Sequence, residues 1–158
     1  MTLGLRKAVT VAALAVTASF LPAVDATASA PSAGSRAAGG YCLANTWNTA
    51  EVRTRACDDF DRGQHWTIRG QQISLTYAPG YCLANTWNTA EVHTRPCDDF
   101  DRGQHWTIRG RQISLTYAPG YCLANTWNTP EVRTRACDDF DRGQHWSIEG
   151  QEISLTYA

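Results

Sequence analysis

Short runs of alternating apolar and polar residues, separated by clusters of turn-forming residues, follow one another from Tyr41 onward. In the first unit of this pattern the runs cover residues 41–45, 51–56, 64–69 and 72–77. The alternation places Trp66 and Ile68 on one face of their run, as a half-buried strand requires, and Gly70 marks a tight turn to the next run. The pattern predicts four β-strands per unit and an all-β fold.

The unit occurs three times, with a period of 40 residues. Its copies cover residues 41–80, 81–120 and 121–158, and the first two differ only at Arg53/His93, Ala56/Pro96 and Gln71/Arg111. Four strands in such a period also describe one blade of a β-propeller, but propellers usually contain about four to eight blades. Three four-strand repeats that close around a pseudo-threefold axis and bury one shared core predict a β-trefoil.

The chain before the repeats has a different composition. Arg6 and Lys7 precede an apolar run over residues 8–21, and small residues follow at 28–30, which is the order typical of a secretory signal peptide. The apolar run is shorter than the roughly 20 residues that span a membrane. We therefore expect residues 1–30 to be a signal peptide, residues 31–39 a flexible leader and residues 40–158 the folded domain of a secreted, extracellular protein that does not insert into membranes.

Cysteine occurs only in the repeats, twice in each. Six cysteines allow fifteen pairings, but export to an oxidising compartment and the lack of a C-x2-C motif favour disulfides over a zinc site. Because each repeat carries the same two positions, pairing within repeats is the arrangement that duplication would preserve. The predicted disulfides are Cys42 with Cys57, Cys82 with Cys97 and Cys122 with Cys137.

The charge pattern excludes one class of partner. The formal net charge is −1, and the repeats contain no lysine, while their arginines alternate with aspartates and glutamates. No basic stripe of the kind that follows a phosphate backbone is present, so we expect no nucleic-acid binding.

Each repeat contains a Gln-x-Trp motif. Gln and Trp, two residues apart, share a strand face, where Trp contributes to the core and a buried Gln must find partners for its amide. The motifs are Gln64-His65-Trp66, Gln104-His105-Trp106 and Gln144-His145-Trp146. Together with Cys-Leu at the start of each repeat, they resemble the ricin B-type lectin family, which has a Gln-x-Trp in each lobe of a trefoil.

This resemblance implies a non-enzymatic, carbohydrate-binding protein with up to three sugar sites. The chain departs from the family's galactose site at three positions of each repeat. In the first repeat Ala44 stands where the family has Asp, Arg55 where it has an aromatic residue, and Gly63 where it has an amide. Any sugar site must therefore be built differently here.

A Trp flanked by two asparagines recurs in the loop after the first strand of each repeat, where it offers an apolar face to a pyranose ring and amides to its hydroxyls. The predicted ligand-binding residues of this motif are Asn45, Trp47, Asn48, Asn85, Trp87, Asn88, Asn125, Trp127 and Asn128. The alternative is a loop Trp that packs over the disulfide. We expect glycans as partners, a monomeric protein and no cofactor.

An acidic turn, residues 58–63 in the first repeat, contains three carboxylates. It lacks the further ligands of an EF-hand calcium loop, so carboxylates that cap backbone amides are favoured over a metal site. One carboxylate per repeat is included among the sugar contacts: Asp59, Asp99 and Asp139. The alternation points His65 and its equivalents outward on separate repeats, and no arrangement typical of a catalytic centre is present. The alternative function is a trefoil without sugar binding, such as a protease inhibitor or a surface-interaction protein.

Overall fold

A computed structural model describes residues 40–157 of the 158-residue chain, so the predicted signal peptide and leader lie outside the described residues. The strands are β1 (Tyr41–Asn45), β2 (Val52–Ala56), β3 (Trp66–Arg69), β4 (Gln72–Leu75), β5 (Tyr81–Asn85), β6 (Val92–Pro96), β7 (Trp106–Arg109), β8 (Gln112–Leu115), β9 (Tyr121–Asn125), β10 (Val132–Ala136), β11 (Trp146–Glu149) and β12 (Glu152–Leu155). Each repeat adds one turn of 3-10 helix: η1 (Arg62–Gln64), η2 (Arg102–Gln104) and η3 (Arg142–Gln144). Within this described part, no helix has the length and apolar character that crossing a membrane requires.

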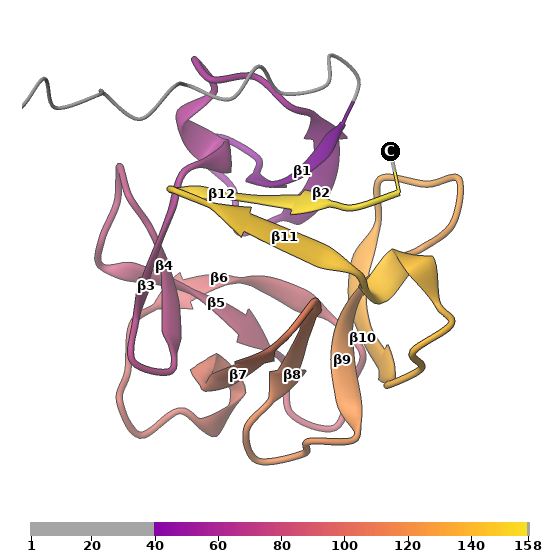
Figure 1. Cartoon of the computed structure of the whole chain (residues 1–158). Helices are drawn as coiled ribbons and strands as arrows, with labels where there is room; N and C mark the ends of the chain where they lie inside the picture. The colour runs from indigo at the N-terminus through magenta and orange to yellow at the C-terminus, as the bar shows by residue number, and fades with distance from the viewer. Residues whose placement is uncertain (1–39, 158) are drawn as a thin grey trace, which may run out of the picture. The chain divides into compact units, whose positions relative to one another are not determined.

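Each sheet combines strands of two successive repeats, as Figure 1 shows. The strand orders are β3-β4-β5-β6, β10-β9-β8-β7 and β11-β12-β1-β2, all antiparallel. The last sheet joins the third repeat to the first and so closes the ring. The predicted all-β trefoil with three four-strand repeats is confirmed.

Two sets of backbone hydrogen bonds tie neighbouring repeats together. The Thr94 amide donates to the Ala50 carbonyl at 2.8 Å, and the Trp106 amide donates to the Gln71 carbonyl at 2.8 Å. Equivalent bonds join the second repeat to the third and the third to the first. No repeat is therefore complete by itself, because some of its strand groups find their partners only in the next repeat.

The core is built from the same five positions of every repeat. In the first repeat they are Leu43, Val52, Trp66, Ile73 and Leu75, each at most 4% exposed. Burial of a side chain of this size stabilises the fold by about 1.5–3 kcal/mol relative to its exposure. The Trp66 indole also donates from Nε1 to the Leu43 carbonyl at 2.9 Å, so its polar atom is satisfied inside the core.

The predicted strand ends need small corrections. Gln64 belongs to η1 and His65 caps it, so β3 begins at Trp66, because the Asp61 carboxylate accepts the Gly63 amide and turns the chain into a helical turn. β2 begins one residue later than predicted, and β4 ends at Leu75 instead of residue 77. Gly70 has φ +59°, in the left-handed region that favours glycine, so the predicted tight turn is confirmed.

The predicted disulfide pairing is also confirmed. Each bridge joins two cysteines of one repeat that are 15 residues apart in sequence, with Cα atoms 5.0 Å apart. In every bridge the first cysteine is buried beside the core, and the second starts the acidic turn. The disulfide therefore fixes the acidic turn to strand β1, β5 or β9 of its repeat.

Candidate functional site

The Gln of the Gln-x-Trp motif holds the acidic turn in place. Gln64 is 1% exposed; its Oε1 accepts the Asp58 amide at 3.0 Å, and its Nε2 donates to the Ala56 carbonyl at 2.9 Å and to Asp61 Oδ2 at 3.2 Å. All polar atoms of the amide are thus paired inside the protein. The motif is structural in this chain, as its buried position requires.

The acidic turn uses two of its carboxylates to cap itself. Asp58 Oδ1 accepts the Phe60 amide at 2.9 Å, and Asp61 Oδ1 accepts the Gly63 amide at 2.9 Å. Asp61 Oδ2 also forms an ion pair with Arg55 Nη2 at 2.7 Å. Capping of this kind is the role that the sequence favours for these aspartates.

The positions of the family's usual galactose site are occupied by other groups. Ala44 is fully buried, and the Arg55 guanidinium donates to the Asn45 carbonyl at 3.1 Å while it pairs with Asp61. A Cβ on Gly63 would lie 2.4 Å from the Asn45 carbonyl oxygen. The chain packs tightly here, and glycine is needed because the backbone of another strand lies against it.

We predict that Gly103→Ala, at the equivalent position of the second repeat, destabilises the protein by about 1–3 kcal/mol, the usual cost of overpacking. Its Cβ would lie 2.3 Å from the Asn85 carbonyl oxygen, so the backbone must shift. Gly80→Ala is the matched control, because no heavy atom lies within 4 Å of a Cβ at that position. Urea unfolding of both variants tests this, and equal midpoints would contradict the close packing.

The first asparagine of the predicted sugar motif faces the interior. Asn45 is 1% exposed; its Nδ2 donates to the carbonyls of Thr49 and Glu51 and to Thr94 Oγ1, and its Oδ1 accepts the Tyr77 hydroxyl at 2.8 Å. Asn85 and Asn125 make the same bonds. These bonds support the loop and the tyrosine from inside the protein. The same three asparagines also line the three pockets described below, so their contact with sugar stays a prediction.

The Trp of the motif stacks on a Tyr that follows the fourth strand of its repeat. The ring centroids of Trp47 and Tyr77 are 5.0 Å apart with an interplanar angle of 19°, and Trp47 remains 56% exposed. Trp87 stacks on Tyr117 and Trp127 on Tyr157 in the same way. The loop Trp therefore does not pack over the disulfide, and each repeat presents a broad aromatic surface to solvent, which we call the Trp–Tyr stack.

The second asparagine of the motif lies at the tip of the loop. Asn48 is exposed and has φ +60°, in the left-handed region that Asn tolerates better than most residues. The loop around it is tied by the Thr46 amide, which donates to the Glu51 carbonyl at 2.9 Å, and by the Thr49 amide, which donates to the Thr46 carbonyl at 3.0 Å. Asn48 is thus presented by an ordered loop beside the Trp–Tyr stack.

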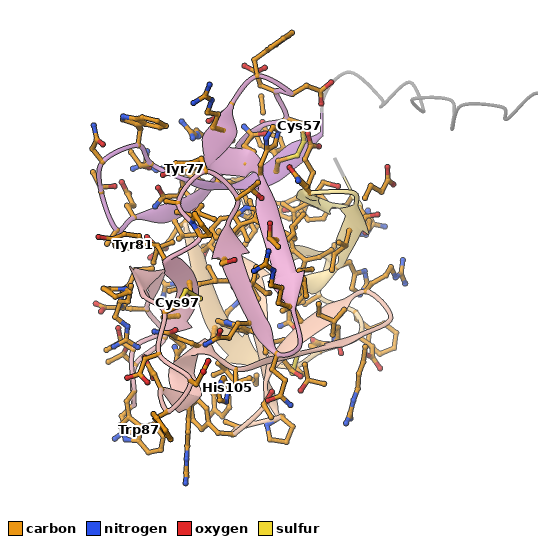
Figure 2. All side chains as sticks on the ribbon, turned by 90° about the vertical axis from the view of Figure 1, so that its left-hand side faces the viewer. Cys57, Tyr77, Tyr81, Trp87, Cys97 and His105 are labelled. Carbon is orange, nitrogen blue, oxygen red and sulfur yellow. A yellow bond between two sulfur atoms is a disulfide. The ribbon has the colours of Figure 1, made fainter. Side chains whose placement is uncertain are left out.

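Three pockets lie between neighbouring repeats, and we call them the junction pockets. Their volumes are about 400, 410 and 360 Å³, in the order first–second, second–third and third–first repeat. The lining of the first includes Asn48, Thr49, Ala50 and Tyr77 of one repeat and Tyr81 and Thr94 of the next. Figure 2 shows Tyr77 and Tyr81 on the same side of the molecule. The tyrosines and Thr49 form the part of this site that the sequence pattern did not predict.

The junction pockets are electrically neutral. Among the described residues, no charged side chain lines any of the three. Burial raises the pKa of Tyr77, and the negative charge of Asp61 raises it further; the equivalent tyrosines share both causes. The tyrosine hydroxyls therefore stay protonated around neutral pH and keep donating to the buried asparagines.

The acidic turn lies apart from these pockets. Asp59, Asp99 and Asp139 are exposed and do not belong to the lining of any junction pocket, so the structure does not bring them together with the predicted Trp and Asn residues. Phe60, Phe100 and Phe140 beside them are 93%, 93% and 92% exposed, which sequence alternation gave no reason to expect. His65 and its equivalents are half-buried, each on its own repeat.

A single histidine distinguishes the second repeat. His93 replaces the arginine found at positions 53 and 133. Its backbone forms an antiparallel β-bridge with Glu51 of the first repeat, and its Nδ1 lies 3.3 Å from Thr86 Oγ1. Burial lowers the pKa of His93 below 6.5, and Arg95 lowers it further, while Glu91 and Asp101 oppose this shift. The folded protein therefore disfavours the imidazolium form.

We predict that His93 makes the protein less stable in mild acid. Because its folded pKa is depressed, the unfolded chain binds a proton more readily, so stability is fully present above pH 6.5 and is lost as the pH falls toward the folded pKa. Glutamine in His93→Gln does not titrate. As the pH falls from 7.5 to 5, we therefore expect the variant to lose less free energy of unfolding than the native protein. Urea unfolding midpoints of both proteins at both pH values test this. An equal change of midpoint with pH in the two proteins would contradict it.

A family model described as the ricin-type β-trefoil lectin domain matches residues 34–153. The chain belongs to this family. No curated protein matches it in sequence.

Two solved structures share the fold at low sequence identity. A non-toxic homologue of type II ribosome-inactivating proteins from Momordica charantia (bitter gourd), in complex with α-methyl-D-galactoside, aligns with a TM-score of 0.62 and 19% identity over 70% of this chain and 45% of that one. GalNAc-T7 with UDP, GalNAc and Mn²⁺ aligns with a TM-score of 0.60 and 18% identity over 70% of this chain and 21% of that one. This lectin domain thus spans less than half of either protein.

Proposed function

We propose that the protein is a secreted lectin that binds glycans without chemical conversion, at the junction pockets between its three repeats. The observation that carries this proposal is the repeated placement of an exposed Trp–Tyr stack beside a neutral pocket of about 400 Å³. Membership of a lectin family and the galactoside bound to the bitter-gourd homologue support the same class of ligand.

The proposed site recognises a sugar by two kinds of contact. The apolar face of a pyranose ring stacks on Trp47, while the amide of Asn48 and the hydroxyls of Thr49 and Tyr81 face the sugar hydroxyls. Asn45 lines the same pocket and also holds Tyr77, which in turn supports the Trp47 ring. Because aromatic rings lose little conformational freedom when they bind, such a platform suits a small, exposed site.

The sites are expected to bind without catalysing a reaction. Among the described residues, hydroxyl, amide and apolar groups line the pockets, and no carboxylate, histidine or thiol does so. A single shallow site binds a sugar weakly, but several sites on one molecule capture a glycan-coated surface through avidity. Secretion fits three disulfides, which persist in oxidising compartments.

A glycan array tests the proposal. The protein without its predicted signal peptide, residues 31–158, is labelled and applied to neutral and acidic glycans, including α-methyl-D-galactoside and N-acetylgalactosamine, with calcium and with a chelator. We expect binding to neutral glycans in both conditions, because the pocket lining contains no carboxylate to hold a metal. Silence across the array would refute the proposal.

One observation favours a second candidate function, contact with another protein. Phe60 and its two equivalents are almost fully exposed, and the turn that carries each of them is fixed by a disulfide and by a buried Gln. Rigid, exposed aromatic side chains often anchor protein interfaces. If the array is silent, replacement of all three Phe by Ser is the variant with which to test protein partners.

A further inference from the structure

The three loops that carry the Trp–Tyr stacks differ at one position. Residues 45–51 and 85–91 are identical in sequence, whereas the third loop has Pro130 where the others have Ala50 and Ala90. The carbonyl of Pro130 accepts the Thr54 amide at 2.8 Å, and the carbonyl of Ala50 accepts the Thr94 amide at 2.8 Å. Proline therefore fits this place without loss of the bond that joins neighbouring repeats.

The pocket beside the third loop also has a different wall. Trp127 lines this pocket together with Pro130, Tyr157 and Tyr41, whereas Trp47 and Trp87 are not part of the lining of their pockets. The Trp127 and Tyr157 centroids are 5.6 Å apart, compared with 5.0 Å in the other two stacks, and Trp127 is the most exposed of the three tryptophans at 61%.

We propose that the three sugar sites are unequal and that the junction pocket between the third and first repeats is the strongest. This inference rests on the proposed function and adds which site dominates and which residues cause it. Two tyrosines line each of the three pockets, and only this pocket has a tryptophan, Trp127, in its lining as well. Pro130 fixes the backbone dihedral φ beside it. Trp127 adds apolar area for the sugar to contact, and Pro130 reduces the ordering that a sugar must impose on the loop.

Single substitutions of the three tryptophans test the inequality. Isothermal titration is carried out with the neutral glycan that gives the strongest array signal and, in parallel, with α-methyl-D-galactoside. We expect one strong site per protein, and Trp127→Ala should weaken its affinity roughly tenfold or more, the effect of losing a binding hot spot. Trp47→Ala and Trp87→Ala should leave the strong site unchanged and serve as matched controls in the same fold.

The role of Pro130 has a test of its own that does not depend on loss of function. Replacing Ala50 and Ala90 by Pro gives the other two loops the sequence of the third, and we expect their sites to tighten severalfold, while Pro130→Ala weakens the strong site by a similar factor. Thermal melts of each variant check that the fold is kept.

The outcomes separate this inference from the proposed function. Equal losses for the three Trp variants, or a strong site that survives Trp127→Ala in a protein with native melting, would overturn the inequality while sugar binding stands. A change in Pro130→Ala or in the double Pro variant opposite to that expected would also overturn it. Failure of every glycan to bind would instead remove the proposed function and the inference with it.

Discussion

Reduction of the three disulfides is expected to remove most of the stability of the trefoil. Each bridge closes a loop of 15 residues, and the release of such a loop in the unfolded state costs about 3 kcal/mol of stability. Three bridges together contribute roughly 9 kcal/mol, which is comparable with the whole stability of about 5–15 kcal/mol of a typical domain. Urea unfolding with and without a reductant, followed by tryptophan fluorescence, measures this loss.

A variant with one bridge removed provides the control for this experiment. The double substitution Cys82→Ser and Cys97→Ser deletes only the bridge of the second repeat, so we expect about one third of the full effect, since distant sites add nearly independently. An unfolding midpoint that reduction leaves unchanged would show that the core alone specifies the fold and that the bridges serve only to fix the acidic turns.

The fold was predictable because its determinants are local and repeated. Each determinant lies within a short stretch of sequence and occurs in all three repeats. The determinants are the alternation of apolar and polar residues, a glycine at positive φ such as Gly70, and two cysteines per repeat. The strand ends were predicted less well because the Asp61 carboxylate accepts a backbone amide and caps η1. Gln64 therefore lies in η1 and not in the strand that the alternation predicts.

The candidate site was less predictable because it is assembled from residues that are far apart in sequence. Asn45 stands beside Trp47 in the chain, which suggests a shared role at the surface. Its partners, however, include Tyr77, 32 residues away, and Thr94, 49 residues away in the next repeat. These bonds engage its amide from inside the protein, and the partner in the next repeat cannot be inferred from a single repeat.

The junction pockets could not be predicted for the same reason. Each one needs the loop of one repeat and the first strand of the next, as Asn48 and Tyr81 show. The sequence describes a repeat as a unit, whereas the ligand site that we propose belongs to the contact between two units. Closure of the ring is therefore a condition for three sites, because the third pocket takes Tyr41 and Thr54 from the first repeat.

Replacement of Trp47, Trp87 and Trp127 by Ala is expected to abolish capture of the protein by a glycan surface. Loss of a binding hot spot costs about 2 kcal/mol or more at each site, and avidity multiplies the separate losses. The fold should survive, because these rings are 55–61% exposed and each loses only a stacking interaction of about 0.5–1.5 kcal/mol. Surface plasmon resonance on immobilised glycan, together with thermal melts, measures both effects.

A triple variant with Ser at Phe60, Phe100 and Phe140 is the matched control, because it also removes three exposed aromatic side chains from the same fold. It should keep full glycan capture if the Trp–Tyr stacks and junction pockets form the sites. Undiminished capture by the triple Trp variant with native melting would reject the Trp platform, and loss of capture in the triple Phe variant would place the site at the acidic turn. If capture and melting of the Trp variant fall together, the tryptophans support the fold, and their role as a ligand platform is refuted.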